Sequence, residues 1–145
     1  MASFLTPRTT LLCTVAAALL VGGCELFVVG GGRRAQQVVE RSQRTPIGVV
    51  YLFKEELDSN NTVAATELMV HSSGRRLLAV EKFEMKDEMA RIQRLIANKP
   101  ITEWAEDTLS ASARDVRITL DHIRKMHFST MLSGDSWFIS RIHDK

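Results

Sequence analysis

Two cysteines are the most reactive side chains of this 145-residue chain, and both stand near its N-terminus, at Cys13 and Cys24. A cysteine thiol can attack an electrophile, bind a metal, form a disulfide or carry an attached group. Both lie in LLCTVAAALLVGGC, residues 11–24, where an apolar run leads into small residues. Arg8 is the only charged residue before this stretch. A short positive region, an apolar run and small residues at its exit are typical of a signal peptide.

The last four residues of that stretch, Val21-Gly22-Gly23-Cys24, resemble the bacterial lipobox, in which an aliphatic and two small residues precede an invariant cysteine. The resemblance implies that the Cys24 thiol receives a diacylglyceryl group, that the chain is cut before Cys24, and that the new amine is acylated, as with palmitate. Cys13 would leave with the signal, so the mature chain would have no free thiol. We therefore expect a lipoprotein signal peptide at residues 1–23 and a lipid-anchored envelope protein, with no thiol-based chemistry.

Three other interpretations of this segment are weaker. A span over residues 11–30 has the length of a membrane helix, but Glu25 inside it would cost about 2.5–3.5 kcal/mol at the centre of the bilayer. Soluble export would prefer an Ala-x-Ala-like site, and a buried core helix would show a helical apolar face.

The residue after Cys24 bears on which membrane holds the anchor. Glu25 is not the aspartate that retains enteric lipoproteins at the inner membrane. We expect an outer-membrane position facing the periplasm.

Composition describes a globular protein. The apolar fraction is 45% and the charged fraction 25%, and 19 basic and 17 acidic residues give a net charge of +2. These charges are mixed along the chain without a basic stripe, so we expect no nucleic-acid partner. The length suits one domain.

The remaining chain divides into a polar, lipidated tether at residues 24–44 and a domain at residues 45–145. Thr45-Pro46 supplies a helix cap and a first-turn proline, and predicts a helix over 46–58. Apolar spacing predicts further helices over 62–70, 77–83 and 85–98. After Pro100 the period changes to two and predicts strands over 101–109, 116–120, 126–132 and 137–142, with turns at 110–112, 124–125 and 133–136. Helices followed by hairpin-connected strands indicate an α+β fold with an antiparallel sheet.

TPIGVVYLFKEELDSNNTVAATELM (45–69) and GDSWFISRI (134–142) resemble the opening and the last strand of the nuclear transport factor two-like superfamily. The resemblance implies a cystatin-like cone, in which N-terminal helices pack on the concave side of a curved sheet. This superfamily tends to dimerise through its sheet, so a homodimer is expected. The fold hosts isomerases, dehydratases, scaffolds and assembly subunits, and does not by itself give a function.

Ketosteroid-isomerase-like chemistry is the first catalytic hypothesis that the resemblance raises. It needs a general-base carboxylate and an oxyanion tyrosine, but Phe53 stands at the tyrosine position and residues 71–80 contain no acid. We therefore expect no catalytic residues and a non-catalytic binding domain. The alternatives are an isomerase-like or dehydratase-like enzyme that uses Glu103, Asp121 or His127, and a structural subunit of an envelope assembly.

Histidines and serines give no stronger signal. His122 and His127 flank the predicted turn without an obvious third ligand, so we expect a surface pair and neither a metal nor a cofactor. Ser73, before Gly74, lacks the strand-turn-helix elbow and a nearby base of a nucleophilic serine.

A binding pocket is the last hypothesis from the sequence. Its lining would be aromatic, with one or two polar residues to orient a small apolar ligand. The same aromatic residues could instead fill the core between helices and sheet, which is the favoured alternative. The domain would bind a partner protein or a small apolar ligand. The candidate residues are Phe53, Trp104, Arg117, His127, Phe128 and Trp137.

Overall fold

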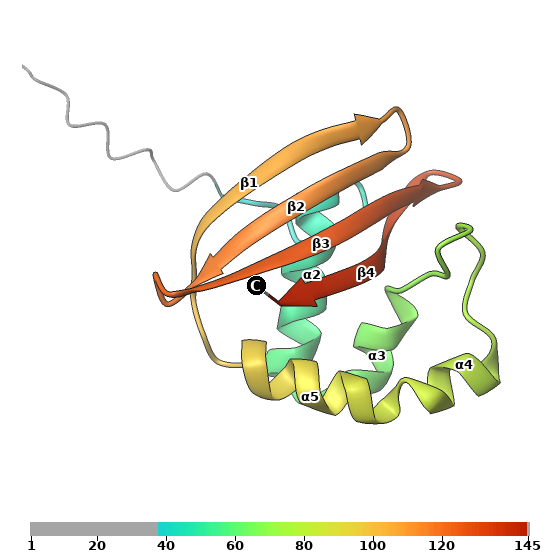
Figure 1. The fold of residues 1–145 in the computed structure, drawn as a ribbon, viewed down its shortest axis with the longest axis horizontal. Helices are drawn as coiled ribbons and strands as arrows, with labels where there is room; N and C mark the ends of the chain where they lie inside the picture. Colours follow the sequence, from blue (N-terminus) through green and yellow to red (C-terminus); the bar gives the residue numbers. More distant parts are fainter. Residues whose placement is uncertain (1–37, 145) are drawn as a thin grey trace, which may run out of the picture. The chain divides into compact units, whose positions relative to one another are not determined.

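A computed structural model of the chain describes residues 38–144 (Figure 1). The signal peptide, Cys24 and most of the tether predicted from the sequence lie outside the described residues. Helices come first and strands follow, which confirms the α+β class. The helices are α2 (Pro46–Asp58), α3 (Thr62–Glu67), α4 (Ala79–Glu84) and α5 (Lys86–Ile96), and the strands are β1 (Ile101–Ser110), β2 (Ala113–Leu120), β3 (Arg124–Ser133) and β4 (Ser136–Asp144).

Helix α2 begins where the sequence predicts. The Thr45 hydroxyl accepts a hydrogen bond from the Gly48 N–H at 3.0 Å, and Pro46 occupies the first turn. This cap satisfies one of the free N–H groups at the helix start. The helix then buries one apolar face completely, through Val49, Val50, Phe53 and Leu57.

Helix α3 is shorter than the predicted helix over 62–70. It ends at Glu67, and the chain then runs along the edge of β4. The Val70 N–H donates to the Ile139 carbonyl and the Ile139 N–H donates to the Leu68 carbonyl, both at 2.9 Å. The prediction was wrong for residues 68–70 because bonds to a strand far away in the sequence replaced the next helical turn.

Helix α5 confirms the helix predicted over 85–98, and Met89, Ile92 and Ile96 of its apolar face are all buried. It ends before Asn98, whose φ of 60° is left-handed, and before Pro100, which disfavours a continuing helix.

Four strands form one antiparallel sheet in the order β1-β2-β3-β4. All four predicted strands are confirmed, but the predicted turn at 124–125 is wrong. Arg124 and Lys125 belong to β3, and the chain reverses at residues 121–123, where Asp121 and His122 have φ values of 51° and 60°. The Arg-Lys pair had suggested a polar turn, whereas Asp121 tolerates the left-handed conformation that this turn needs.

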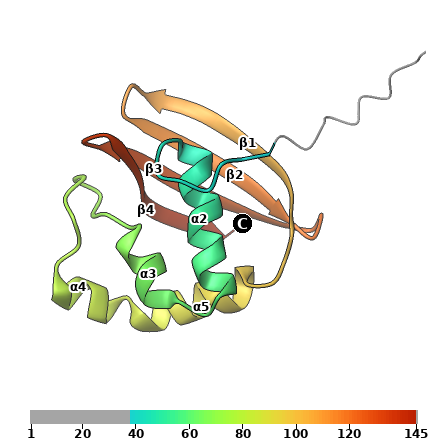
Figure 2. The ribbon, with the colours of Figure 1, turned by 180° about the vertical axis from the view of Figure 1, so that it is seen from behind.

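Helix α2 lies across one face of the sheet, and no helix of residues 38–144 covers the opposite face, which is turned toward the viewer in Figure 1 (Figures 1 and 2). The core lies between α2, α5 and the covered face, where Val116, Ile118 and Phe128 are buried. None of the helices in this part of the chain combines the length and apolar character of a membrane span.

Residues just before α2 pack against the domain. The Trp137 N–H donates to the Gln43 carbonyl at 2.7 Å, and the Gln43 amide donates to the Trp137 carbonyl at 3.1 Å. Arg41 forms an ion pair with Glu55 of α2 at 2.8 Å. Arg41 and Gln43, which the sequence assigns to the tether, therefore contact the domain.

Candidate functional site

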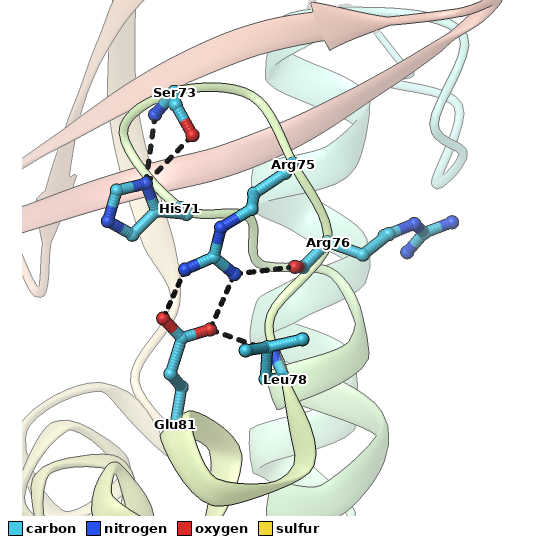
Figure 3. A network of polar contacts seen from close by, with 6 residues as sticks. All are labelled: His71, Ser73, Arg75, Arg76, Leu78 and Glu81. Atoms are coloured by element: carbon cyan, nitrogen blue, oxygen red, sulfur yellow. Dashed lines mark hydrogen bonds and ion pairs between the residues drawn. The ribbon is translucent and has the colours of Figure 1, made fainter.

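The segment between α3 and α5 carries a network of polar contacts (Figure 3) and also presents exposed apolar side chains. It begins with a tight turn after Val70. The His71 N–H donates to the Arg75 carbonyl at 2.9 Å and the Gly74 N–H donates to the His71 carbonyl at 2.8 Å. Gly74 has a φ of 83°, a conformation that favours glycine.

Glu81 is the centre of this network. Its carboxylate accepts two hydrogen bonds from the Arg75 guanidinium, at 2.7 and 2.5 Å, and one from the Leu78 N–H at 2.7 Å (Figure 3). Bidentate pairs of this kind fix orientation as well as charge. The Arg75 hydrogen bonds, followed by the Leu78 N–H, lower the pKa of Glu81 to about 2. Glu81 thus joins the loop to the start of α4.

Two further contacts attach the segment to the rest of the domain. The Arg76 guanidinium lies over the Phe138 ring of β4, 4.1 Å from its centroid, and donates to the Glu67 carbonyl at 3.0 Å. Lys82 of α4 pairs with Glu67 at 2.5 Å. The loop and α4 are therefore held against both α3 and β4.

This framework presents three exposed apolar side chains, which we call together the α4 surface: Leu78, Val80 and Phe83. Their exposed fractions are 57%, 58% and 76%. Val80 and Phe83 are three residues apart on one helix and so are neighbours on its surface. Neighbouring exposed apolar side chains are a feature of protein-binding sites.

His71 and Ser73 lie at the tip of the loop and make a Ser–His contact that the sequence did not predict. The Ser73 hydroxyl is 2.9 Å from His71 Nδ1, and the Ser73 N–H donates to the same nitrogen at 3.2 Å. His71 Nδ1 contacts both the hydroxyl and the backbone N–H of Ser73, which is only two residues further along the chain. The contact therefore closes a local turn. The nearest acid of the network, Glu81, is engaged by Arg75 (Figure 3).

The aromatic residues of the predicted pocket lie on the covered side of the sheet. Phe53 and Phe128 meet edge to face, with centroids 6.1 Å apart and an interplanar angle of 70°. Trp137 is 8% exposed in the same core. Trp104 is half-buried and packs against that core. Whether these four line a cavity stays a prediction.

The polar residues of the predicted pocket lie elsewhere. Along β2 and β3 the alternation of buried and exposed residues turns Arg117 and His127 to the uncovered face. There Arg117 pairs with Asp107 at 2.8 Å and His127 with Asp115 at 3.3 Å. The six residues therefore do not share one face, because neighbours along a strand point to opposite sides.

The acids of the alternative enzyme hypothesis are also apart from His127. Glu103 is exposed on β1 opposite Thr119, and Asp121 lies in the turn between β2 and β3. Within residues 38–144, no three His, Cys, Asp or Glu side chains are grouped to hold a metal ion.

Comparisons with known proteins add no assignment: no family model matches the chain, and neither a curated protein nor a solved structure matches it.

The network around Glu81 was missed from the sequence because Arg75 and Glu81 are six residues apart, which is not a helical spacing. The one local signal was Glu81 at the third position of α4, where a carboxylate commonly reaches back to the N-cap N–H.

Proposed function

We propose that this protein is a bacterial lipoprotein of the cell envelope, anchored through Cys24 at the outer membrane facing the periplasm, and that its domain is non-catalytic and binds a partner protein. We further propose that the domain is a nuclear transport factor two-like cone. The sequence Val21-Gly22-Gly23-Cys24 supports the anchor, and the order of helices before an antiparallel sheet is compatible with the cone.

One observation carries the binding function: the α4 surface, exposed and yet fixed by the Arg75–Glu81 pair. A backbone segment that is already held in place loses little conformational entropy on binding, which favours affinity. Residues 75–88 contain four basic and four acidic residues, so charge gives this surface no attraction to anionic lipid. An apolar surface of another protein fits it better.

The anchor is tested by intact-mass analysis of the protein isolated from bacterial membranes. We expect a chain that lacks residues 1–23 and carries lipid on Cys24. Cys24→Ala should block processing, and Cys13→Ala, in the same apolar stretch, is the matched control that should be processed normally. An unmodified Cys24 or a retained Met1 would overturn the proposal.

The binding surface is tested separately, with a photo-crosslinking amino acid at position 83 in cells. Position 109 is the matched control, because Leu109 is also apolar and 64% exposed but lies at the end of β1. We expect a discrete protein adduct from position 83 alone, which Glu81→Ala weakens because it releases the start of α4. Equal adducts from both positions, or none from position 83, would contradict the assignment of this surface.

A further inference from the structure

The uncovered face of the sheet places two histidines opposite each other. In the pairing of β3 with β4, His127 is the partner of His143. Met126 and Phe128, on either side of His127, are buried against the helices, so His127 points to the uncovered face. Directly opposed residues of antiparallel strands point to the same side. His143 therefore shares that face with His127.

His127 is held in an orientation that suits a metal ligand. Its Nδ1 is 3.3 Å from Asp115 Oδ2. An ionised carboxylate only accepts hydrogen bonds, so the neutral tautomer that suits this contact has its proton on Nδ1 and a free lone pair on Nε2. Histidines that bind metals almost always place their other nitrogen against a carboxylate, a carbonyl or a water.

Strand geometry brings the two rings within reach of one ion. The Cβ atoms of opposed residues are about 4.5–5.5 Å apart. Two imidazole nitrogens on one ion lie about 3 Å apart, because each bond is about 2.0–2.1 Å long. The His127 side chain is 22% exposed and His143 is exposed, so water can fill the remaining positions.

The surrounding charges select among metals. Arg117, opposite His127 on β2, is neutralised by Asp107. Lys125 and Arg141 lie two positions from the histidines along the same face. Their positive charge weakens the binding of any cation at this place. Only an ion with a high affinity for imidazole can bind under these conditions, and Cu²⁺ has the highest of the divalent first-row ions.

We propose that His127 and His143 form a two-imidazole site for a divalent late first-row transition-metal ion, with Cu²⁺ bound most tightly, and that Asp115 is the positioning residue that orients His127. The site is independent of the α4 surface and of the lipid anchor. The sequence did not suggest it because the two histidines are 16 residues apart and it placed His122, not His143, beside His127.

The first experiment uses the unmutated full chain, purified in detergent and titrated with Cu²⁺ at pH 7. Electron paramagnetic resonance of the first equivalent should show two imidazole nitrogens on the copper. Calorimetry should give tighter binding of Cu²⁺ than of Zn²⁺. A spectrum with a single imidazole nitrogen, or none, would overturn the proposal without any variant.

Variants locate the site. His127→Ala and His143→Ala should each weaken Cu²⁺ binding at least tenfold. Asp115→Asn should weaken it about 10- to 100-fold while both nitrogens remain in the spectrum. His71→Ala and His122→Ala are the matched controls, since the fold places these histidines in two other turns. Unchanged affinity in both strand variants, or loss of binding in either control, would assign the copper to another place and contradict the proposal.

Discussion

At the scale of single residues, Glu81 links the local chemistry of one turn to the surface that we assign to binding. Its carboxylate both closes the N-terminus of α4 and receives Arg75. Because the ionised form is the one that accepts these three hydrogen bonds, its protonation must loosen the loop and α4 together. The α4 surface should therefore depend on a residue that does not belong to it.

The pH dependence of stability tests this link. The ordinary pKa of this carboxyl is 4.5 and that in the folded chain is about 2, so ionised Glu81 stabilises the fold above pH 4.5 and this contribution is lost as the pH falls toward 2. Glu81→Gln should lower the Tm at pH 7 and change it little at pH 2, as measured by circular dichroism. Glu84→Gln, on the same helix but outside the network, is the control (Figure 3). An equal loss at both pH values would show that the carboxylate charge is not the cause.

At the scale of elements, the segment before α2 shows how packing decides where the domain begins. A Cβ built on Gly48 would lie 2.6 Å from the Ser42 carbonyl oxygen and 2.7 Å from the Glu40 carbonyl oxygen. Such distances are shorter than any normal contact, so α2 needs glycine here for the preceding residues to lie against it. The sequence interpretation as a tether rested on polarity, which does not reveal this close approach.

Gly48→Ala tests the contact directly. Helix propensity alone predicts a gain of about 1 kcal/mol in a helix interior. We expect instead a loss of about 1–3 kcal/mol in the free energy of unfolding, because backbone atoms must move to admit the methyl group. Urea denaturation measures the difference. A more stable variant would mean that residues 40–45 do not pack on α2.

At the scale of the whole domain, the two edges of the sheet differ. The β4 edge is paired with Gln43 near its start and with Leu68 and Val70 further along. Within residues 38–144, β1 pairs with β2 alone. An open edge leaves strand N–H groups exposed to solvent or to another chain.

Hydrogen exchange should report this asymmetry. The amides of Trp137 and Ile139, which donate to carbonyls outside the sheet, should exchange at rates close to those of the central strands β2 and β3. The N–H groups of β1 that face away from β2 should exchange faster, because they donate hydrogen bonds to water alone. NMR-detected exchange on the full chain measures both groups. Equal rates on the two edges would indicate that β1 has a partner in solution.

The sequence by itself determined the class of the fold and most of its elements. The signals for these elements are local: the spacing of apolar residues, the helix cap at Thr45 and Pro46, and the end of a helix before Pro100. Helices α2 and α5 and the four strands could therefore be predicted without knowledge of their neighbours. The lipid anchor at Cys24 rests on a local pattern as well and stays a prediction. The mistake at residues 68–70 falls where bonds to a distant strand compete with local preference. The turn misplaced at residues 124–125 is a local error, because the left-handed residues Asp121 and His122 lie just before it.

Only the tertiary structure decided which side chains meet. It brought Phe53 to Phe128, separated Arg117 and His127 from them by the thickness of the sheet, and set His127 opposite His143. Strand register fixes these pairs, and register depends on hydrogen bonds between segments that are far apart in the sequence. The same holds for the α4 surface, since the contacts of Arg76 with Phe138 and of Lys82 with Glu67 hold it in place. Local patterns determine the elements, and long-range pairing determines the sites.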